Sequence, residues 1–175
     1  MAQKDKTQSK EEAFVNAVIE KLKGPDTSFG ASLRRADNPA TEYQSWEYLC
    51  RWCDIEKSRD YKPYALIGAA LARAKPQANG RLGIGRSIAL CYSDEGTLNG
   101  NEQPAAKAKL RRLLACDTAE EACGMLRPLL RLIESRNVQL NYADLLKDLS
   151  RPGEWFNNYV KAKWAKDFYC KKEEE

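Results

Sequence analysis

The chain has 175 residues, of which 29 are Lys or Arg and 25 are Asp or Glu, so its formal net charge is only +4. A chain of this length forms one domain or two small ones and buries roughly 70% of its unfolded surface, so it needs neither a metal nor a disulfide to fold. The small net charge excludes a strong field over the whole molecule, so any site for a polyanion must come from local clustering of cations.

Apolar residues recur at helical spacing along nearly the whole chain, and the alternation typical of strands is absent. The sequence therefore predicts an all-α protein with about eight or nine helices in two small helical-bundle lobes. A first helix is expected over 10–23, ended by Gly24-Pro25, and residues 26–28 cap a short helix that carries 29–36. A longer helix over 38–56 follows, with a predicted core face formed by Tyr43, Trp46, Leu49, Cys50 and Cys53.

Pro63 is expected to begin the next apolar helix, and a short helix preceded by two glycines follows within 81–92. In the second half, Pro104 suits a first helical position, Thr118 and Glu121 form a capping box, and Asn141 caps a further helix. Pro152 starts the last helix, which carries Trp155, Tyr159, Val160 and Phe168. The expected organisation is a flexible tail (1–9), an N-terminal lobe (10–95), a linker (96–103), a C-terminal lobe (104–170) and a charged tail (171–175).

No apolar stretch is long enough to span a membrane, and the charged N-terminus lacks the apolar region of a signal peptide. We therefore expect a cytoplasmic protein without a membrane partner. In that setting the six cysteines are expected to be reduced core residues and not a disulfide framework. Trp46, Trp155 and Trp164 fit apolar stripes and are expected in the core or at a subunit contact, whereas either Trp52 or Tyr92 could be exposed.

Catalytic and metal-binding patterns are missing from the sequence. The chain has no histidine, which excludes the usual serine triads, zinc proteases and Cys-His nucleophiles. Cys50 and Cys53 have no second ligand pair that would complete a zinc site, and "GRLGIGR" lacks the strand and the G-K-[ST] of a phosphate loop. We expect no enzymatic activity, no metal and no cofactor.

Paired arginines are the most informative feature of the chain. "ASLRRA" (31–36) and "AKLRRLL" (108–114) each place two arginines directly after a leucine. Lys107 with Arg111 and Arg127 with Arg131 stack like charges one helical turn apart, which costs a few tenths of a kcal/mol per pair in an isolated helix. Such a face suits a bound phosphate. The alternative is a solvated surface whose arginine stems cover apolar groups.

The order of several blocks resembles a known family. "FGASLRRA", "LGIGRSIAL", "LLACD", "LRPLLRLI", "LNYADLLKDL" and "KWAKDFY" are similar to blocks of the CasB family, the small subunit of the type I-E CRISPR surveillance complex Cascade. The resemblance spans about residues 29–169. It implies a non-catalytic helical subunit of two lobes, present as two copies lying head to tail, that packs on the guide-RNA-bearing subunits and stabilises unwound DNA.

The resemblance also implies which cations contact nucleic acid, whether single-stranded or unwound DNA or guide RNA. Arg131 joins this set only because it lies one turn from Arg127. Pro128 replaces an arginine of the family pattern and is expected to bend or locally interrupt its helix. The predicted nucleic-acid-binding residues are Arg34, Arg35, Arg86, Lys107, Lys109, Arg111, Arg112, Arg127 and Arg131.

Sequence-independent binding through the sugar-phosphate backbone needs no base-reading element, which agrees with this spread of cations. Two other functions stay open on the sequence: a scaffold subunit that contacts only protein, and a stand-alone helical regulator or undetected enzyme. Arg34 and Arg111 must lie on the same face of the fold if the cations are to form one phosphate track.

Overall fold

A computed structural model describes residues 8–93 and 100–170. The predicted charged tail (171–175), most of the predicted N-terminal tail (1–9) and half of the predicted linker (96–103) therefore lie outside the described residues. The helical elements are α1 (Lys10–Lys23), α2 (Thr27–Arg34), the 3₁₀ turn η1 (Glu42–Ser45), α3 (Trp46–Leu49), α4 (Ser58–Ala74), α5 (Ile84–Cys91), the 3₁₀ turn η2 (Gly100–Glu102), α6 (Pro104–Leu114), α7 (Ala119–Ser135), α8 (Tyr142–Leu149), α9 (Gly153–Trp155), the π-helical turn η3 (Phe156–Val160) and α10 (Lys161–Tyr169).

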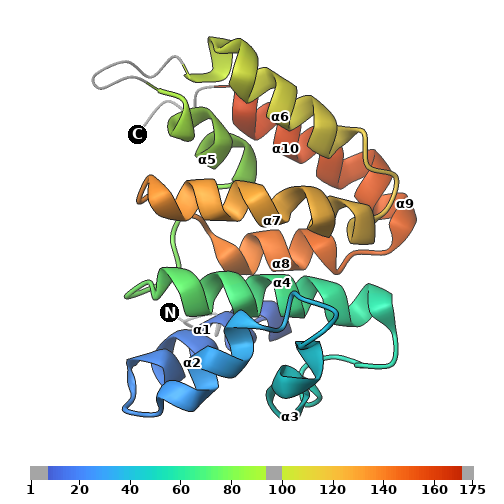
Figure 1. Cartoon of the computed structure of the whole chain (residues 1–175). Helices are drawn as coiled ribbons and strands as arrows, with labels where there is room; N and C mark the ends of the chain where they lie inside the picture. The colour runs from blue at the N-terminus through green and yellow to red at the C-terminus, as the bar shows by residue number, and fades with distance from the viewer. Residues whose placement is uncertain (1–7, 94–99, 171–175) are drawn as a thin grey trace, which may run out of the picture.

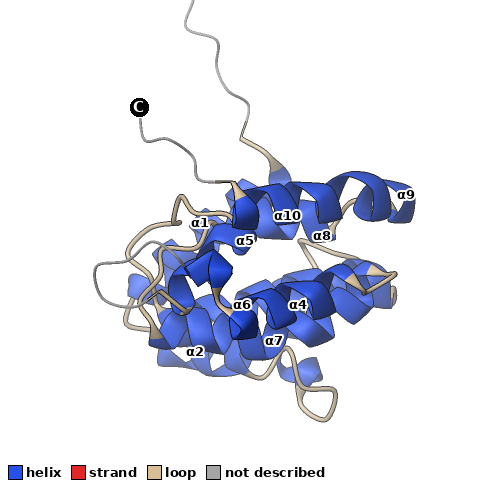
Figure 2. Cartoon of the chain, turned by 90° about the horizontal axis from the view of Figure 1, so that it is seen from above, coloured by secondary structure: helices blue, strands red, loops and turns tan. Residues whose placement is uncertain are grey.

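The all-α class is confirmed, since the described residues contain helices, turns and a single isolated bridge between Leu82 and Leu140. Helices α2, α4, α6 and α7 lie toward one face of the molecule, and α1, α8 and α10 lie toward the opposite face (Figures 1 and 2). None of the described helices is both long and apolar enough to cross a membrane.

Local capping explains where several helices begin. The Asp26 carboxylate accepts hydrogen bonds from the N–H groups of Ser28 and Phe29 at the start of α2. Thr118 accepts from Glu121 N–H at α7, and Asn141 accepts from Asp144 N–H at α8. These contacts satisfy backbone donors that have no partner inside the helix. The predicted helices over 10–23 and 118–136 are accordingly found close to their expected bounds.

The predicted continuous helix over 38–56 is wrong. Only η1 and α3 form there, one directly after the other and with turns on both sides, because side chains compete for the main chain. Asn38 accepts from Ala40 N–H, and the buried Ser45 hydroxyl donates to the carbonyl of Glu42. The predicted core face is divided as a result: Leu49 and Cys53 are buried, whereas Tyr43, Trp46 and Cys50 are exposed.

Two prolines lie inside helices. The helix predicted to begin at Pro63 begins at Ser58, five residues earlier, so Pro63 follows its first turn. Helix α7 continues through Pro128 without interruption, contrary to the expectation of a local break there. Pro128 is exposed, so the missing N–H lies on the solvent side of the helix.

The core is continuous from α1 to α10. Helix α1 packs against α4 and α8, α4 against α7, and α5 against α6 and α10. Helix α5, which the sequence groups with the N-terminal lobe, thus makes close contacts with helices of the second half. The division into two lobes at 96–103 stays a prediction.

The cysteines are all free, but only four of them are buried: Cys53, Cys91, Cys116 and Cys123. The expectation of a core position is therefore wrong for Cys50 and Cys170, which are exposed. Burial raises the pKa of the Cys123 thiol to about 12 and that of Cys91 to about 11. These two thiols stay protonated at neutral pH, so they are not nucleophiles.

Candidate nucleic-acid interface

Helix α7 presents two of the predicted arginines to solvent. Its buried side is formed by leucines and Ile133, and Arg127 and Arg131 lie one turn apart on the exposed side. Arg131 makes no ion pair with a described residue. Arg127 does: its Nε lies 3.4 Å from Asp37 Oδ2. Part of the positive charge predicted for α7 is therefore already balanced by a carboxylate.

Asp37 connects three segments of the fold. Its side chain is only 7% exposed, and its Oδ2 also lies 3.4 Å from Nη1 of Arg73, which is 16% exposed. Arg73 Nε approaches Glu134 Oε2 at 4.0 Å. We call Asp37, Arg73, Arg127 and Glu134 the Asp37 cluster. It ties the turn after α2 to α4 and α7.

Arg73 was missed by the sequence prediction. Its Nε and Nη2 atoms are buried and have no hydrogen-bond partner among the described residues. The signal in the sequence was a single arginine at the end of the apolar run "YALIGAALARA", where a cation needs a carboxylate to offset the cost of its desolvation.

Arg34 and Arg35 lie beside this cluster because they end α2 only two or three residues before Asp37. Both are exposed. The Arg35 guanidinium donates a hydrogen bond to the side-chain carbonyl of Gln44, and this contact holds the Arg35 side chain against η1. Leu33, the leucine before the pair, is fully buried, as expected for an anchor in the core.

Helix α6 carries the largest group of cations without a carboxylate partner. Ala106, Leu110 and Leu113 are buried, so the helix is anchored along one side. Arg111 and Arg112 are exposed, and Lys107 and Lys109 are half-buried. None of these four cations makes an ion pair with any residue that the structure describes.

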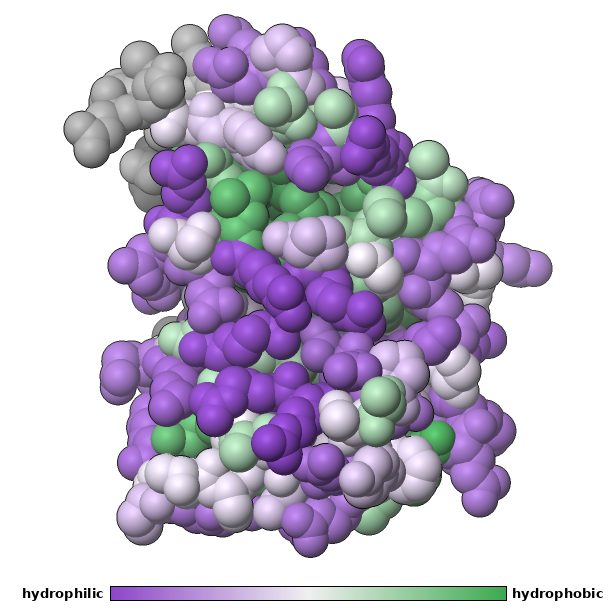
Figure 3. Space-filling model, viewed as in Figure 1, coloured by the Kyte–Doolittle hydropathy of each residue, from purple (hydrophilic) through white to green (hydrophobic). Residues whose placement is uncertain are grey.

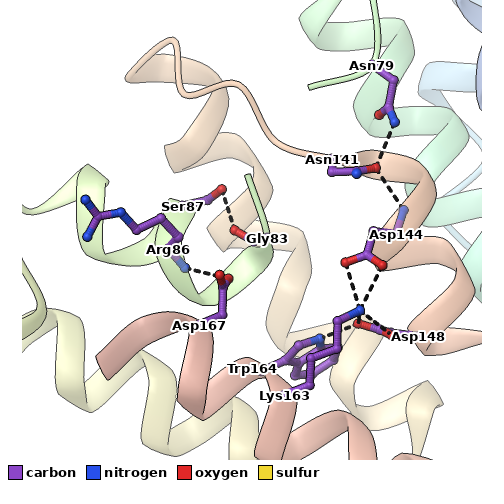
Figure 4. Close-up of polar contacts among 10 residues, drawn as sticks. All are labelled: Asn79, Gly83, Arg86, Ser87, Asn141, Asp144, Asp148, Lys163, Trp164 and Asp167. Carbon is purple, nitrogen blue, oxygen red and sulfur yellow. Dashed lines mark hydrogen bonds and ion pairs between the residues drawn. The ribbon is translucent and has the colours of Figure 1, made fainter. Parts of the chain in front are cut away.

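Arg86 lies apart from the others, on α5. Its main-chain N–H donates to Asp167 Oδ2 at 2.8 Å, so a carboxylate of α10 caps the start of α5 (Figure 4). The guanidinium points away from Asp167 in the same view. The capping contact fixes the backbone of Arg86 and leaves its charged group free of that carboxylate.

Figure 3 shows that the most hydrophilic surface forms a band over α7 and α4, on the face that α2 and α6 also border. The structure thus brings the end of α2 to α7 through Asp37, and packs α6 against α7. Helix α5 packs against α10 and α6. Arg86 therefore lies beside α10, whereas the arginines at the end of α2 and on α7 lie beside the Asp37 cluster. The role of all nine residues in nucleic-acid binding stays a prediction.

The described residues hold no group of three or more Cys, Asp or Glu side chains that could bind a metal ion. What the surface offers is a set of guanidinium and ammonium groups on several helices. Such a surface can bind an extended phosphodiester backbone.

Comparisons with known proteins agree with one another. The model of the family CRISPR-associated protein Cse2 matches residues 30–169. No curated protein matches the sequence. A chain of a solved CRISPR RNA-guided surveillance complex has the same fold, with a TM-score of 0.71, 18% identity and 91% coverage of both chains.

The crystal structure of a CRISPR-associated protein of the Cse2 family from Thermus thermophilus is also similar. It has a TM-score of 0.67 and 20% identity, covering 91% of this chain and 97% of that one. The family match spans most of the sequence and confirms the resemblance drawn from its leucine and arginine blocks. The chain belongs to the Cse2 (CasB) family of CRISPR-associated proteins.

Proposed function

We propose that this protein is the non-catalytic small subunit of a type I-E CRISPR surveillance complex, acting in antiviral defence. It packs on the subunits that carry the guide RNA, in two copies lying head to tail, and stabilises the unwound DNA by binding its sugar-phosphate backbone. Family membership and the fold shared with a chain of an RNA-guided surveillance complex support the assembly.

The observation that carries the nucleic-acid role is the set of unpaired cations on α6. Lys107, Lys109, Arg111 and Arg112 lie on one helix that has no acidic residue, and no described carboxylate balances them. Arg131 adds an unpaired guanidinium on the neighbouring helix α7. In an R-loop the guide supplies sequence recognition by pairing, so a subunit that holds the opened strands must accept any sequence.

The Arg111→Gln/Arg112→Gln variant is expected to bind single-stranded DNA with a weaker dependence on salt. Each lost phosphate contact lowers the slope of log K against log salt by about 0.7, so the double variant loses roughly 1.4. The measurement is a titration of labelled single-stranded DNA across a salt series.

Arg51→Gln/Arg59→Gln is the matched control, since it removes the same two charges at exposed positions outside the predicted set. An unchanged slope in the α6 variant would exclude the proposed phosphate contacts. Absence of DNA binding by the wild-type protein, with normal assembly into the complex, would make the protein a scaffold that contacts only protein.

Asp37→Asn is expected to tighten DNA binding severalfold at low salt while lowering the free energy of unfolding by about 2 kcal/mol. The substitution keeps the size of the side chain but leaves Arg73 and Arg127 without their shared carboxylate. Asp60→Asn makes the same change of net charge at an exposed position. An equal increase in DNA affinity in both variants would mean that only net charge matters.

A further inference from the structure

Two aromatic side chains next to the last helix are exposed, one of them Trp155, which the sequence predicts in the core or at a subunit contact. Trp155 is 56% exposed and Tyr159 is 48% exposed. Their ring centroids are 6.2 Å apart with an edge-on geometry. Exposed aromatic surface of this size, unlike single scattered apolar residues, marks a binding site.

Arg151 completes this surface. Its guanidinium carbon lies 5.2 Å from the centroid of the Tyr159 ring and 5.9 Å from that of Trp155. We call Arg151, Trp155 and Tyr159 the aromatic platform. Because the guanidinium contacts both rings, it limits their motion and adds positive charge beside them.

The platform has a rigid support. The turn η3 is π-helical, and its Phe156 and Val160 side chains are fully buried in the core. Trp164 is buried one further turn along and packs edge-on against Phe156, with ring centroids 5.7 Å apart. Turns of this type insert an extra residue and are frequent at functional sites. Trp155 and Tyr159 lie four residues apart and are both on the outer side of the chain here.

A groove of about 730 Å³ begins at Tyr159 and runs between α5, α8 and α10. Ile84 and Trp164 contribute apolar surface, Asn158 contributes an amide, and Arg81 and Lys166 contribute cations. This volume lies within the range of sites that hold small molecules, and one nucleotide fits it.

The groove is lined by charges of both signs, and its carboxylates are held by partners within the fold. Asp167 accepts the main-chain N–H of Arg86 at the N-terminus of α5, where a negative charge is favourable. Lys163 also lines the groove. Its Nζ donates to the carboxylate of Asp144 and to that of Asp148, with N–O distances of 2.8 to 2.9 Å (Figure 4). Asp148 accepts a further hydrogen bond from Trp164 Nε1 at 2.9 Å. These groups satisfy one another, whereas Arg81 and Lys166 form no ion pair with a described residue.

We propose that the aromatic platform and this groove bind a segment of single-stranded nucleic acid. A base stacks on Trp155 and Tyr159, and the adjoining phosphate lies in the groove near Arg81 and Lys166. The exposed Glu154 carboxylate lies beside Trp155 and Tyr159, so the phosphate is expected on the groove side, where the free cations are. This inference rests on the proposed function, which supplies the single-stranded nucleic acid. The contact itself is separate from the cations of α6.

The two cations of the groove that have no carboxylate partner, Arg81 and Lys166, favour a nucleic acid over an apolar protein segment. An apolar peptide would have to desolvate Arg81 and Lys166 without giving either an anion. A nucleotide supplies both a flat ring and an anion, and stacking accepts every base because each has a π face.

The test is a titration of the protein into a short oligothymidine that carries one 2-aminopurine, whose fluorescence is quenched when the base stacks. Wild type is expected to quench it. Trp155→Ala is expected to weaken binding between about five- and 150-fold with an unchanged salt slope, because stacking and not a phosphate contact is lost. Trp155→Phe should retain most of the affinity, and Tyr43→Ala is the control at an exposed aromatic in the first half of the chain.

The outcomes separate the two proposals. The Arg111→Gln/Arg112→Gln variant should change the salt slope and keep the quenching, so an unchanged slope there counts only against the phosphate contacts of α6. Absence of quenching by wild type, or equal binding by Trp155→Ala and Tyr43→Ala, would overturn the aromatic platform as a base-stacking site. Loss of assembly in Trp155→Ala with unchanged DNA binding would also overturn it, by making the platform a contact for protein.

Discussion

Replacing Gly85 with alanine is expected to lower the free energy of unfolding by about 3 kcal/mol, at the upper end of the cost of overpacking. A Cβ at this position would lie against the carbonyl oxygen of Trp164 and 2.7 Å from the main-chain nitrogen of Phe168. Both are backbone atoms of α10, so no side-chain rotation can relieve the clash. Helix α5 would have to move off α10, the helix against which its N-terminus is capped. Urea unfolding measures the loss.

Gly124→Ala is the control for this prediction. Gly124 lies inside α7, and an added Cβ would meet nothing within 4 Å. Since glycine is a poor helix former, this variant is expected to gain about 0.5 to 1 kcal/mol. Equal stability of the two variants would mean that α5 and α10 do not pack as closely as described.

Lys163→Met is expected to lower the free energy of unfolding by about 3 kcal/mol at neutral pH, because it leaves a buried carboxylate without its cation. Asp148 is 1% exposed and depends on Lys163 and Trp164 for its hydrogen bonds. The double variant Asp148→Asn/Lys163→Met removes the uncompensated charge and should recover much of the loss. Thermal or urea unfolding of the single and double variants makes the comparison.

The loss in Lys163→Met is expected to shrink as the pH is lowered. Burial raises the pKa of Asp148, and the hydrogen bonds from Lys163 and Trp164 oppose that rise in the wild type. Without Lys163 the folded-state pKa lies further above the unfolded value of 3.8, so the folded protein takes up a proton first and gains stability as the pH falls through that raised pKa. A loss that is constant from pH 7 to acid pH would contradict this assignment.

In the wild-type protein the contacts between Lys163 and its two carboxylates affect stability at alkaline pH. Burial by itself would lower the pKa of Lys163, but the hydrogen bonds to Asp144 and Asp148 outweigh it and raise the pKa above its ordinary 10.5. The stabilisation by Lys163 is therefore present throughout the neutral range and is lost only as the pH rises through that raised value.

Local signals in the sequence were sufficient for most of the helices. Asp26, Thr118 and Asn141 cap the helices predicted for them, because a cap depends only on residues two or three positions away. The prediction failed over 38–56 for a related reason. There the competing hydrogen bonds of Asn38 and Ser45 are equally local, but they disrupt a helical pattern that looked continuous.

The position of Trp155 shows the limit of periodicity. The apolar pattern of the last helix includes Trp155 and Tyr159, whereas the residues that face the core are Phe156, Val160, Trp164 and Phe168, which follow one another at intervals of four. Trp155 precedes Phe156 by one residue, which places it on a different side of the helix from this buried stripe. An aromatic residue in an apolar helix therefore need not face the core.

Paired arginines could be found from spacing alone, but their partners could not. Asp37 is 36 residues from Arg73 and lies on a separate segment from Arg127. Only the packing of α2, α4 and α7 brings these charges together. Exposure of Arg111 and Arg112 followed from the leucines beside them, whereas the neutralisation of Arg127 required the tertiary structure.

The packing of early helices on late ones also sets an order of events during synthesis. Helix α1 packs on α8, and α5 packs on α10. Apolar residues of α5 such as Ile84 and Ile88 are therefore buried only after a segment some 80 residues further along the chain has been synthesised. Until the last helix has emerged from the ribosome, the growing chain exposes these surfaces and is prone to aggregation. Completion of the fold therefore requires the last helix and is expected to be slower than in bundles whose contacts are all local.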